Sequence, residues 1–431
     1  MTSIPTTVQS RNYLLLTVAI ITSLVLLINV SFKIIVVHGF LFTANSILCP
    51  LVAGLYLLVL NSCNPVQQRQ VLYQSILALY LFSVGIYVLV NLPAVANIKA
   101  NIAYEIMFKE IPRKFFSSTL AFGLGFYLPY LCFQRKTGEL PHSAKRCLLL
   151  ALIGGFVFFS IDFLLLFADP NAKNFIQIYV NSMMVCIAIL ACIWLAYYLC
   201  MQRKKSEKIV DKKVASCHSN LTYQYLVGFS VVILLICLSC EYRLISFANG
   251  LLFVAGSVLF PLCFMVSNIT GELCGYKANL IKTGILLLSE LAFNLVLLSI
   301  MLLPSPDFFD NAYASCITPR RIPAATMALV LALGSNAFLL EKFKNTAWGH
   351  YRLLRIFVAN GIANSLQCLV NYTILFAGIY PGELILNLAL NAWGYKILVT
   401  LVSLPVVLWL IEVMRRCTAP VELEEGIPVA A

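Results

Sequence analysis

GLLFVAGSVLFPL (250–262) repeats, without a gap, a stretch that stands 211 residues earlier in the chain, GFLFTANSILCPL (39–51). Eight of the 13 positions are identical, and the matches include Pro50 and Pro261 near the end of each copy. The separation is close to half of the 431-residue chain. The repetition therefore predicts that one structural plan occurs twice.

The composition places this plan in a membrane. Hydrophobic residues make up 61% of the chain and charged residues only 11%, whereas soluble domains carry about 25% charged residues. Apolar runs of about 20 residues recur, each long enough to cross a hydrocarbon core as a helix, and they lack the alternating polarity of barrel strands. We predict an all-α polytopic membrane protein with about 12 transmembrane helices, at approximately 13–31, 40–60, 71–91, 115–133, 147–168, 176–200, 224–242, 250–269, 280–302, 323–341, 353–378 and 387–412.

The repetition extends along the predicted spans. Pro93 and Pro304 both end the third span of their half, and Pro112 and Pro323 both begin the fourth. Each half then contains six spans in the same order. Because six is even, the halves have the same orientation and form a parallel repeat about an axis along the membrane normal. The predicted parts are a first six-span repeat at 1–201, a basic linker at 202–222, a second repeat at 223–416 and an acidic tail at 417–431.

The distribution of Lys and Arg predicts the orientation. With both termini and every second loop on one side, that side holds 20 of the 30 basic residues. Cytoplasmic loops are enriched in Lys and Arg, so both termini are expected on the cytoplasmic side of an inner (plasma) membrane. The same enrichment accounts for the net charge of +12. We expect no nucleic acid as a partner, since no aromatic-plus-basic binding motif is present.

Several kinds of chemistry are not expected. Most of the 15 cysteines lie inside apolar runs, where they behave as small hydrophobes, and the four histidines are scattered. Without paired Cys or His motifs, we expect no metal site, no cofactor and no catalytic residues. The phosphate-binding patterns GxxxxGKS and GxxxxGKT are absent, so the chain is not expected to hydrolyse ATP itself.

Polar side chains inside the spans are the candidates for function, because burying them in a membrane is costly. Asp162, Glu290 and Lys396 are the ionisable ones, and they could couple transport to protons. Glu241 stands near the outer end of a span and is expected to reach water. Amides are more numerous, and their number favours a polar interior between the helices. They are Asn29, Asn181, Asn268, Asn336, Asn364, Gln367, Asn371 and Asn391.

Two prolines predict bent helices at the same place in each half. Proline frees a backbone carbonyl inside a helix, and in a membrane that carbonyl needs another partner. Ser46 stands one turn before Pro50, and Ser257 stands one turn before Pro261. We therefore predict a matched pair of kinked helices that face an interior.

The segment that begins near the end of the second copy carries a family resemblance. FPLCFMVSNITGELCGYK (260–277) resembles the signature of the vitamin uptake transporter family, also called the queuosine-precursor transporters, which are bacterial inner-membrane proteins with six spans. Segments at 317–344 and 371–385 resemble the fourth and fifth spans of that family, and Lys396 matches a lysine in its sixth. The resemblance covers about 240–415. The residues that occupy the motif positions are Pro261, Leu262, Phe264, Glu272, Gly275, Tyr276 and Lys277.

The resemblance implies a transporter that imports a 7-deazaguanine, a flat heterocycle with hydrogen-bond donors and acceptors on its edge. Glu272 could then accept two N–H groups of that edge, and Tyr276 could stack on the ring. The amides expected to bind the rest of the edge are Asn268, Asn336, Asn371 and Gln367.

The chain departs from the family pattern at several of these positions. Asn268, Asn336 and Asn371 stand where aspartates are expected. In the first half, Asn61 occupies the position of Glu272, whereas Asp162 falls opposite Asn371. The chain is therefore expected to be an internally duplicated, diverged member whose halves no longer share the same chemistry.

Three alternatives stay open beside a transporter of this family. A carrier of the major facilitator type would have a glycine-and-arginine loop between its second and third spans, but this loop reads NSCNPVQQRQ (61–70). A membrane enzyme would need paired His or acidic residues at a membrane face, and none stand out. A non-transporting scaffold is compatible with the duplication and with the missing aspartates.

Overall fold

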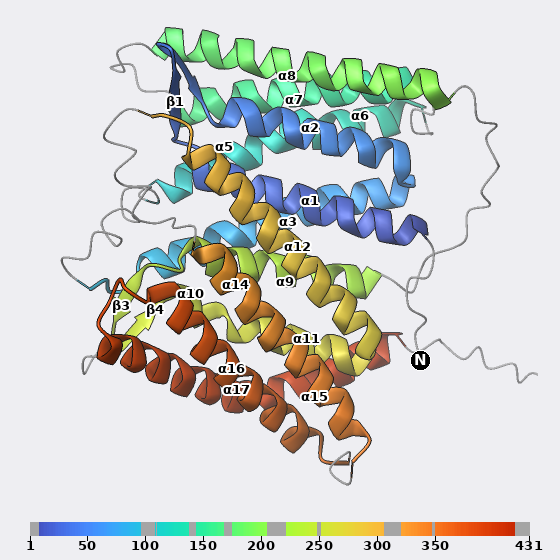
Figure 1. Ribbon diagram of the computed structural model, residues 1–431. Coiled ribbons are helices and arrows are strands. Elements are labelled where there is room, and N and C mark those ends of the chain that lie inside the picture. Colours follow the sequence, from blue (N-terminus) through green and yellow to red (C-terminus); the bar gives the residue numbers. More distant parts are fainter. Residues whose placement is uncertain are drawn as a thin grey trace, which may run out of the picture.

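The computed structural model describes residues 8–95, 108, 110–137, 144–167, 175–204, 221–247, 251–305, 320–346 and 350–418. Most of the expected linker, at 205–220, and the tail from 419 onward lie outside these residues. The described residues contain 12 helices that are long and apolar enough to cross a membrane (Figure 1). The prediction of a multi-pass helical membrane protein with about 12 spans is confirmed.

The first part of the chain begins with an apolar helix that is followed by a small hairpin. Its elements are α1 (Val8–Val30), β1 (Ile34–Val37), β2 (Phe40–Thr43), α2 (Asn45–Ser62), α3 (Pro65–Val90), α5 (Ile111–Phe122), the π-helical turn η1 (Gly123–Tyr127), α6 (Leu128–Thr137), α7 (Ala144–Phe167) and α8 (Phe175–Lys204).

The second part of the chain also begins with a helix and a hairpin. Its elements are α9 (Leu221–Ser239), β3 (Leu244–Ser246), β4 (Leu252–Val254), α10 (Ala255–Leu259), α11 (Pro261–Leu273), α12 (Tyr276–Met301), α14 (Arg321–Leu329), the π-helical turn η3 (Val330–Gly334), α15 (Ser335–Lys344), α16 (Arg352–Phe376) and α17 (Gly382–Thr418).

Two short antiparallel hairpins correct the predicted starts of two spans in this otherwise helical fold. The second span of each half was expected to begin near residues 40 and 250, but β2 and β4 occupy the first residues of those runs. β-Branched and aromatic residues favour strands, and β1 and β2 read IIVV and FLFT. His38 and Gly39 both have positive φ, which is the turn geometry that suits a two-residue hairpin. In each part, the apolar run contains a short strand followed by a helix, and hydropathy does not distinguish the two.

The two prolines lie differently in the second helix of each part. Pro50 lies inside the continuous helix α2, whereas Pro261 is the first residue of α11 and follows the end of α10 at Leu259. The serine one turn earlier is used in the same way in both parts. Ser46 Oγ donates to the carbonyl of Thr43, and Ser257 Oγ donates to that of Val254, each at 2.7 Å. The serines thus bind the end of each hairpin.

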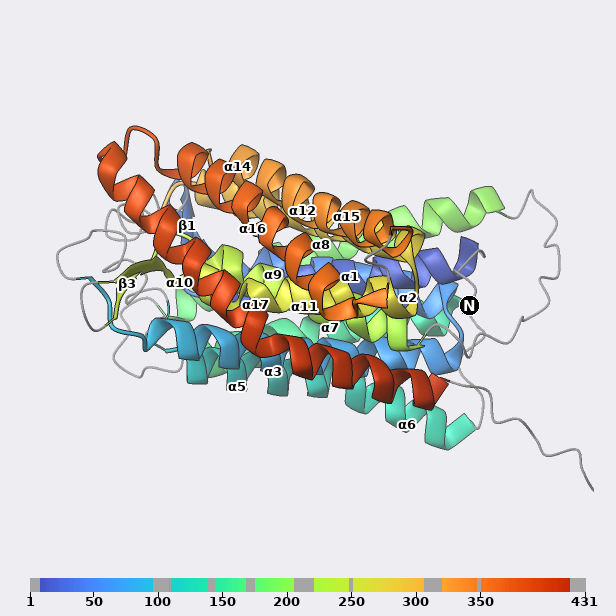
Figure 2. The ribbon, with the colours of Figure 1, turned by 90° about the horizontal axis from the view of Figure 1, so that it is seen from below.

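Helices α1 and α9 lie in the centre of the bundle, and α8 and α17 lie at opposite edges (Figure 1). Within the apolar windows, 83% of the α1 residues and 72% of the α9 residues are buried, against 11% for α8 and 22% for α17. Figure 2 shows α17 running along the face that α16 and α11 also form. Both hairpins lie at the same end of the helices, on the left in both views.

Reciprocal polar contacts join the two parts near the hairpins. Lys33 Nζ donates to the carbonyl of Met301 at the end of α12 (3.0 Å), and Arg243 Nη2 donates to that of Val90 at the end of α3 (2.5 Å). Cations are favoured there because helix C-termini carry partial negative charge.

The hairpins repeat this exchange through their backbones. The amide of Val36 donates to the carbonyl of Pro304 at 2.8 Å, and the amide of Ser246 donates to that of Pro93 at 2.9 Å. Each hairpin therefore binds the chain that follows the third long helix of the other part.

Candidate functional site

A narrow pocket that combines polar groups with a largely apolar wall lies inside the second part of the chain, between α9, α10, α14, α16 and α17. Its volume is about 40 Å³, which is room for little more than one water molecule. Gly256 forms part of the wall, and a Cβ at this position would lie 2.3 Å from the carbonyl oxygen of Cys237. The glycine thus lets α10 lie directly on α9. The polar and aromatic lining residues are Glu241, Ser257, Phe260, Gln367, Asn371, Tyr372 and Lys396.

A larger cavity lies elsewhere, between α1, α3 and α9, with a volume of about 420 Å³. Its described lining is apolar except for Gln74, Thr222 and the hydroxyl of Tyr225. Polar solutes need convergent polar groups for recognition, and this cavity contains no ionisable side chain that is charged at neutral pH. Despite its smaller size, the pocket around Lys396 is therefore the better candidate for binding a polar solute.

Lys396 brings a positive charge from α17 into the pocket. The residue is fully buried, and its Nζ donates to Gln367 Oε1 and lies 3.5 Å from Cys368 Sγ. The same nitrogen lies 4.9 Å from the centre of the Phe260 ring, within cation–π range. These partners are all neutral, and no carboxylate of the described residues forms an ion pair with Lys396. The ammonium group is therefore available to an acceptor on a bound solute.

Glu241 contributes a carboxylate to the same pocket, from the turn that follows α9. It was expected to reach water, but only 7% of the residue is exposed. Arg321 Nε lies 3.3 Å from Glu241 Oε2, and the side chain of Asn371 hydrogen-bonds to the carboxylate. Burial raises the pKa of Glu241 to about 7, with a smaller push from Glu290, whereas Arg321 and Asn371 oppose the shift. The pocket thus contains a carboxyl group whose pKa lies near neutral pH and which forms an ion pair with Arg321.

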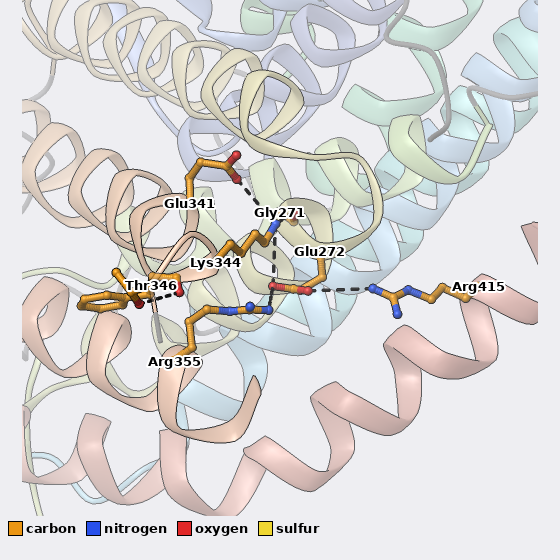
Figure 3. Close-up of polar contacts among 8 residues, drawn as sticks. Gly271, Glu272, Glu341, Lys344, Thr346, Arg355 and Arg415 are labelled. Carbon is orange, nitrogen blue, oxygen red and sulfur yellow. Dashed lines mark hydrogen bonds and ion pairs between the residues drawn. The ribbon is translucent and has the colours of Figure 1, made fainter. Parts of the chain in front are cut away.

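Glu272 lies outside the lining of this pocket, at the end of α11 (Figure 3). Its Oε1 accepts a hydrogen bond from Arg355 Nη2 at 2.6 Å, and both side chains are only 5% exposed. Lys344 Nζ lies 3.8 Å from Oε1, and Arg415 Nη2 lies 3.9 Å from Oε2. Lys344 also donates to the carbonyl of Gly271 at 2.9 Å. These contacts define an ion-pair cluster that joins the ends of α11, α15, α16 and α17.

The remaining predicted site residues of the second part are spread over several helices. Asn336 Nδ2 donates to Asn360 Oδ1 at 2.5 Å, which links α15 to α16. Asn268 is buried in α11, and neither of its side-chain polar atoms has a hydrogen-bond partner among the described residues. Tyr276 is partly exposed at the start of α12. Of the predicted residues, the structure brings Gln367, Asn371 and Lys396 together.

The other two predicted intramembrane acids are held by neutral donors. Asp162, in the first part, accepts hydrogen bonds from Asn45 Nδ2 at 2.6 Å and Ser118 Oγ at 2.9 Å. Glu290, in α12, accepts hydrogen bonds from Asn294 Nδ2 at 2.6 Å and from Thr326 Oγ1 at 2.9 Å. Neither residue lines the pocket around Lys396.

The sequence did not identify four of the polar and aromatic lining residues as binding groups. They are Glu241, Ser257, Phe260 and Tyr372. Glu241 stood out only as an acid at the end of a span, and nothing in the sequence indicated Arg321 as its partner. Phe260 and Tyr372 are two of many aromatic residues, which make up 12% of the chain. Their positions beside Lys396 and Gln367 depend on how α11, α16 and α17 pack.

Comparison with known proteins adds a family match in the same region. Residues 254–410 match the family described as "Putative vitamin uptake transporter". No curated protein and no solved structure matches the chain. The matched segment runs from the last residue of β4 into α17 and contains Phe260, Gln367 and Lys396. The second part of this multi-pass membrane protein is therefore similar to vitamin uptake transporters, and the match indicates a transporter rather than an enzyme.

Proposed function

We propose that the chain is an inner-membrane transporter that imports a small polar heterocycle, a queuosine precursor of the 7-deazaguanine class or a related vitamin-like compound. The observation that carries this proposal is the pocket around Lys396. There, a buried cation with neutral partners lies among amides, a carboxylate and aromatic rings. Lys396, Gln367 and Phe260 belong to the segment that is similar to vitamin uptake transporters, whereas Glu241 precedes it.

The groups of the pocket complement the edge of such a heterocycle. A 7-deazaguanine has N–H donors and a carbonyl acceptor on one side of a flat ring. The Glu241 carboxylate and the Gln367 amide can accept from the N–H groups, and Lys396 can donate to the carbonyl. Phe260 and Tyr372 offer faces for stacking. Glu241 thus takes the role that the family resemblance assigned to Glu272.

Substrate entry requires the pocket to open. Pockets for small organic ligands usually have volumes of about 300–1,000 Å³, far above the 40 Å³ of this pocket. The helices around Lys396 therefore have to separate during transport, as they do in carriers that expose a central site to one side at a time. The structure is that of a closed conformation.

The architecture that supports this movement is a parallel repeat of two six-helix parts. Both parts have the same order of helices, hairpin and π-helical turn, and their hairpins exchange contacts with each other's third long helix. With both termini cytoplasmic, the hairpins and Glu241 face the outside and the Glu272 cluster faces the cytoplasm. A scaffold without transport would leave the buried cation of Lys396 without a role.

The proposal is tested by uptake of labelled queuine and its biosynthetic precursors into a bacterial host that makes no queuosine and lacks its own importer. Expression of the chain is expected to raise uptake above the empty-vector level and to restore queuosine in tRNA. Unlabelled 7-deazaguanines should compete with the labelled compound for uptake. A chain that is inserted in the membrane at normal levels but gives no uptake would refute this substrate class.

Uptake is expected to depend on pH through Glu241, whose pKa is raised to about 7 by burial. The protonated acid cannot accept two N–H groups, so affinity should fall as the external pH drops from about 8 to about 6. Glu241→Gln should lower uptake at the higher pH and flatten the profile. Initial uptake rates against pH measure this, with the exposed Glu110→Gln as the control. A step near pH 7 that survives in the Glu241→Gln variant would show that another group titrates.

A further inference from the structure

Four amide side chains follow one face of α16 away from the pocket. They are Asn360, Asn364, Gln367 and Asn371, at spacings of four, three and four residues. At about 100° per residue these positions fall within a sector of about 60°, and at about 1.5 Å per residue they cover about 16 Å along the helix. The first three are buried, with at most 5% of each residue exposed. We refer to these four residues as the amide stripe.

The two ends of the amide stripe have partners, whereas its middle does not. Gln367 and Asn371 line the pocket, and Asn360 accepts a hydrogen bond from Asn336. Between them, Asn364 is fully buried, and neither its Oδ1 nor its Nδ2 has a hydrogen-bond partner among the described residues. Asn336 Oδ1 likewise has none. A buried amide without partners is costly, and more so at membrane depth, where lipid supplies no hydrogen bonds. Such atoms are expected where water or a polar solute passes.

Apart from Asp162, the matching face in the first part of the chain is apolar and closely packed. With Asp162 opposite Asn371, the residues opposite Asn360, Asn364 and Gln367 are Ala151, Gly155 and Phe158. The Phe158 ring packs against Phe122 and Phe126, at centroid distances of 5.9 and 5.7 Å.

Gly155 shows how little space this face of the first part has. A Cβ at Gly155 would lie 2.6 Å from the Cβ of Ala53. The positions that carry Asn364 and Gln367 in the second part are therefore occupied in the first part by residues that pack closely on their neighbours.

We infer that the transport path runs through the second part alone and continues from the pocket along the amide stripe. Asn364 and the Asn336–Asn360 pair form a second binding station on this path, for a solute edge that carries N–H and C=O groups, and the first part acts as a support. The inference rests on the proposed function for the identity of the solute. The claim that water reaches Asn364 holds whichever solute is transported.

Two measurements test the inference. Asn364→Leu and Asn360→Leu are expected to lower uptake about tenfold or more, because the solute then loses its hydrogen bonds between pocket and exit. Binding of the labelled precursor to the purified protein should change less than about twofold, since the pocket keeps all its groups. The matched control is Ser365→Ala, a neighbouring hydroxyl on the exposed face of α16 that bonds to Trp393. Uptake by both Leu variants within twofold of the parent would overturn the inference.

A second measurement does not depend on the solute being known. Asn364→Cys should react with a small water-soluble thiol reagent, and peptide mass spectrometry would locate the label at position 364. Ala363→Cys, at the adjacent buried position outside the stripe, should not react. A folded Asn364→Cys protein that stays unlabelled would refute a water-filled path even if uptake is observed. Labelling without uptake of any 7-deazaguanine would instead keep the path and refute the proposed substrate.

Discussion

Lys396→Met is expected to lower kcat/KM for uptake about 10- to 150-fold. A hydrogen bond from a charged group contributes about 1.5–3 kcal/mol, and each 1.4 kcal/mol corresponds to a factor of about ten. Lys396 is the buried cation of the pocket, and its partners Gln367 and Cys368 are neutral. Met has a similar length but cannot donate a hydrogen bond to the solute. The measurement is the initial rate of uptake against solute concentration, at matched expression.

The stability of the same variant separates binding from folding. Burying a charge without an opposite charge beside it is costly, so Lys396→Met should unfold at the same temperature as the parent or higher. Lys342→Met is the control, because Lys342 is exposed and lies over the ring of Phe338. Uptake by Lys396→Met within twofold of the parent would show that the pocket is not the site of transport.

Hydropathy was sufficient to predict the spans but not the hairpins. A transmembrane helix appears in the sequence as a long apolar run, and this chain has 12 helices of that kind among its described residues. The strands β2 and β4 continue such runs without any change of polarity, as in FLFT before the helix that starts at Asn45. The turn between β1 and β2 depends on positive φ at His38 and Gly39, and hydropathy carries no information about backbone angles.

The candidate site could be predicted only where a residue type is unusual for a membrane. Lys396, Gln367 and Asn371 stand out because polar groups in a span are costly, and they do line the pocket. The family motif drew attention to Glu272, yet the use of that carboxylate depends on Lys344, Arg355 and Arg415, which come from three other helix ends. A local motif identifies an important residue without identifying its partners.

Glu272→Gln is expected to destabilise the protein by about 3–5 kcal/mol, the usual cost of removing one partner of a buried ion pair. The pair with Arg355 dominates this effect, because both side chains are 5% exposed and their atoms lie 2.6 Å apart. Lys344 and Arg415 are 26% and 37% exposed, so water screens their contribution. A glutamine keeps one acceptor oxygen for Arg355 but removes the negative charge of the pair.

The measurement is denaturant-induced unfolding of the purified protein in detergent, monitored by the loss of the helical circular-dichroism signal. Glu412→Gln is the matched control, since Glu412 pairs with Arg416 on the surface of α17, where the two side chains are 50% and 78% exposed. An exposed pair contributes about 0–1 kcal/mol. Adding Arg355→Met to Glu272→Gln should cost less than the sum of the two single changes, because the two side chains contact each other directly. If Glu272→Gln were no more destabilising than Glu412→Gln, the carboxylate would be solvated, and the cluster would not hold the four helix ends together.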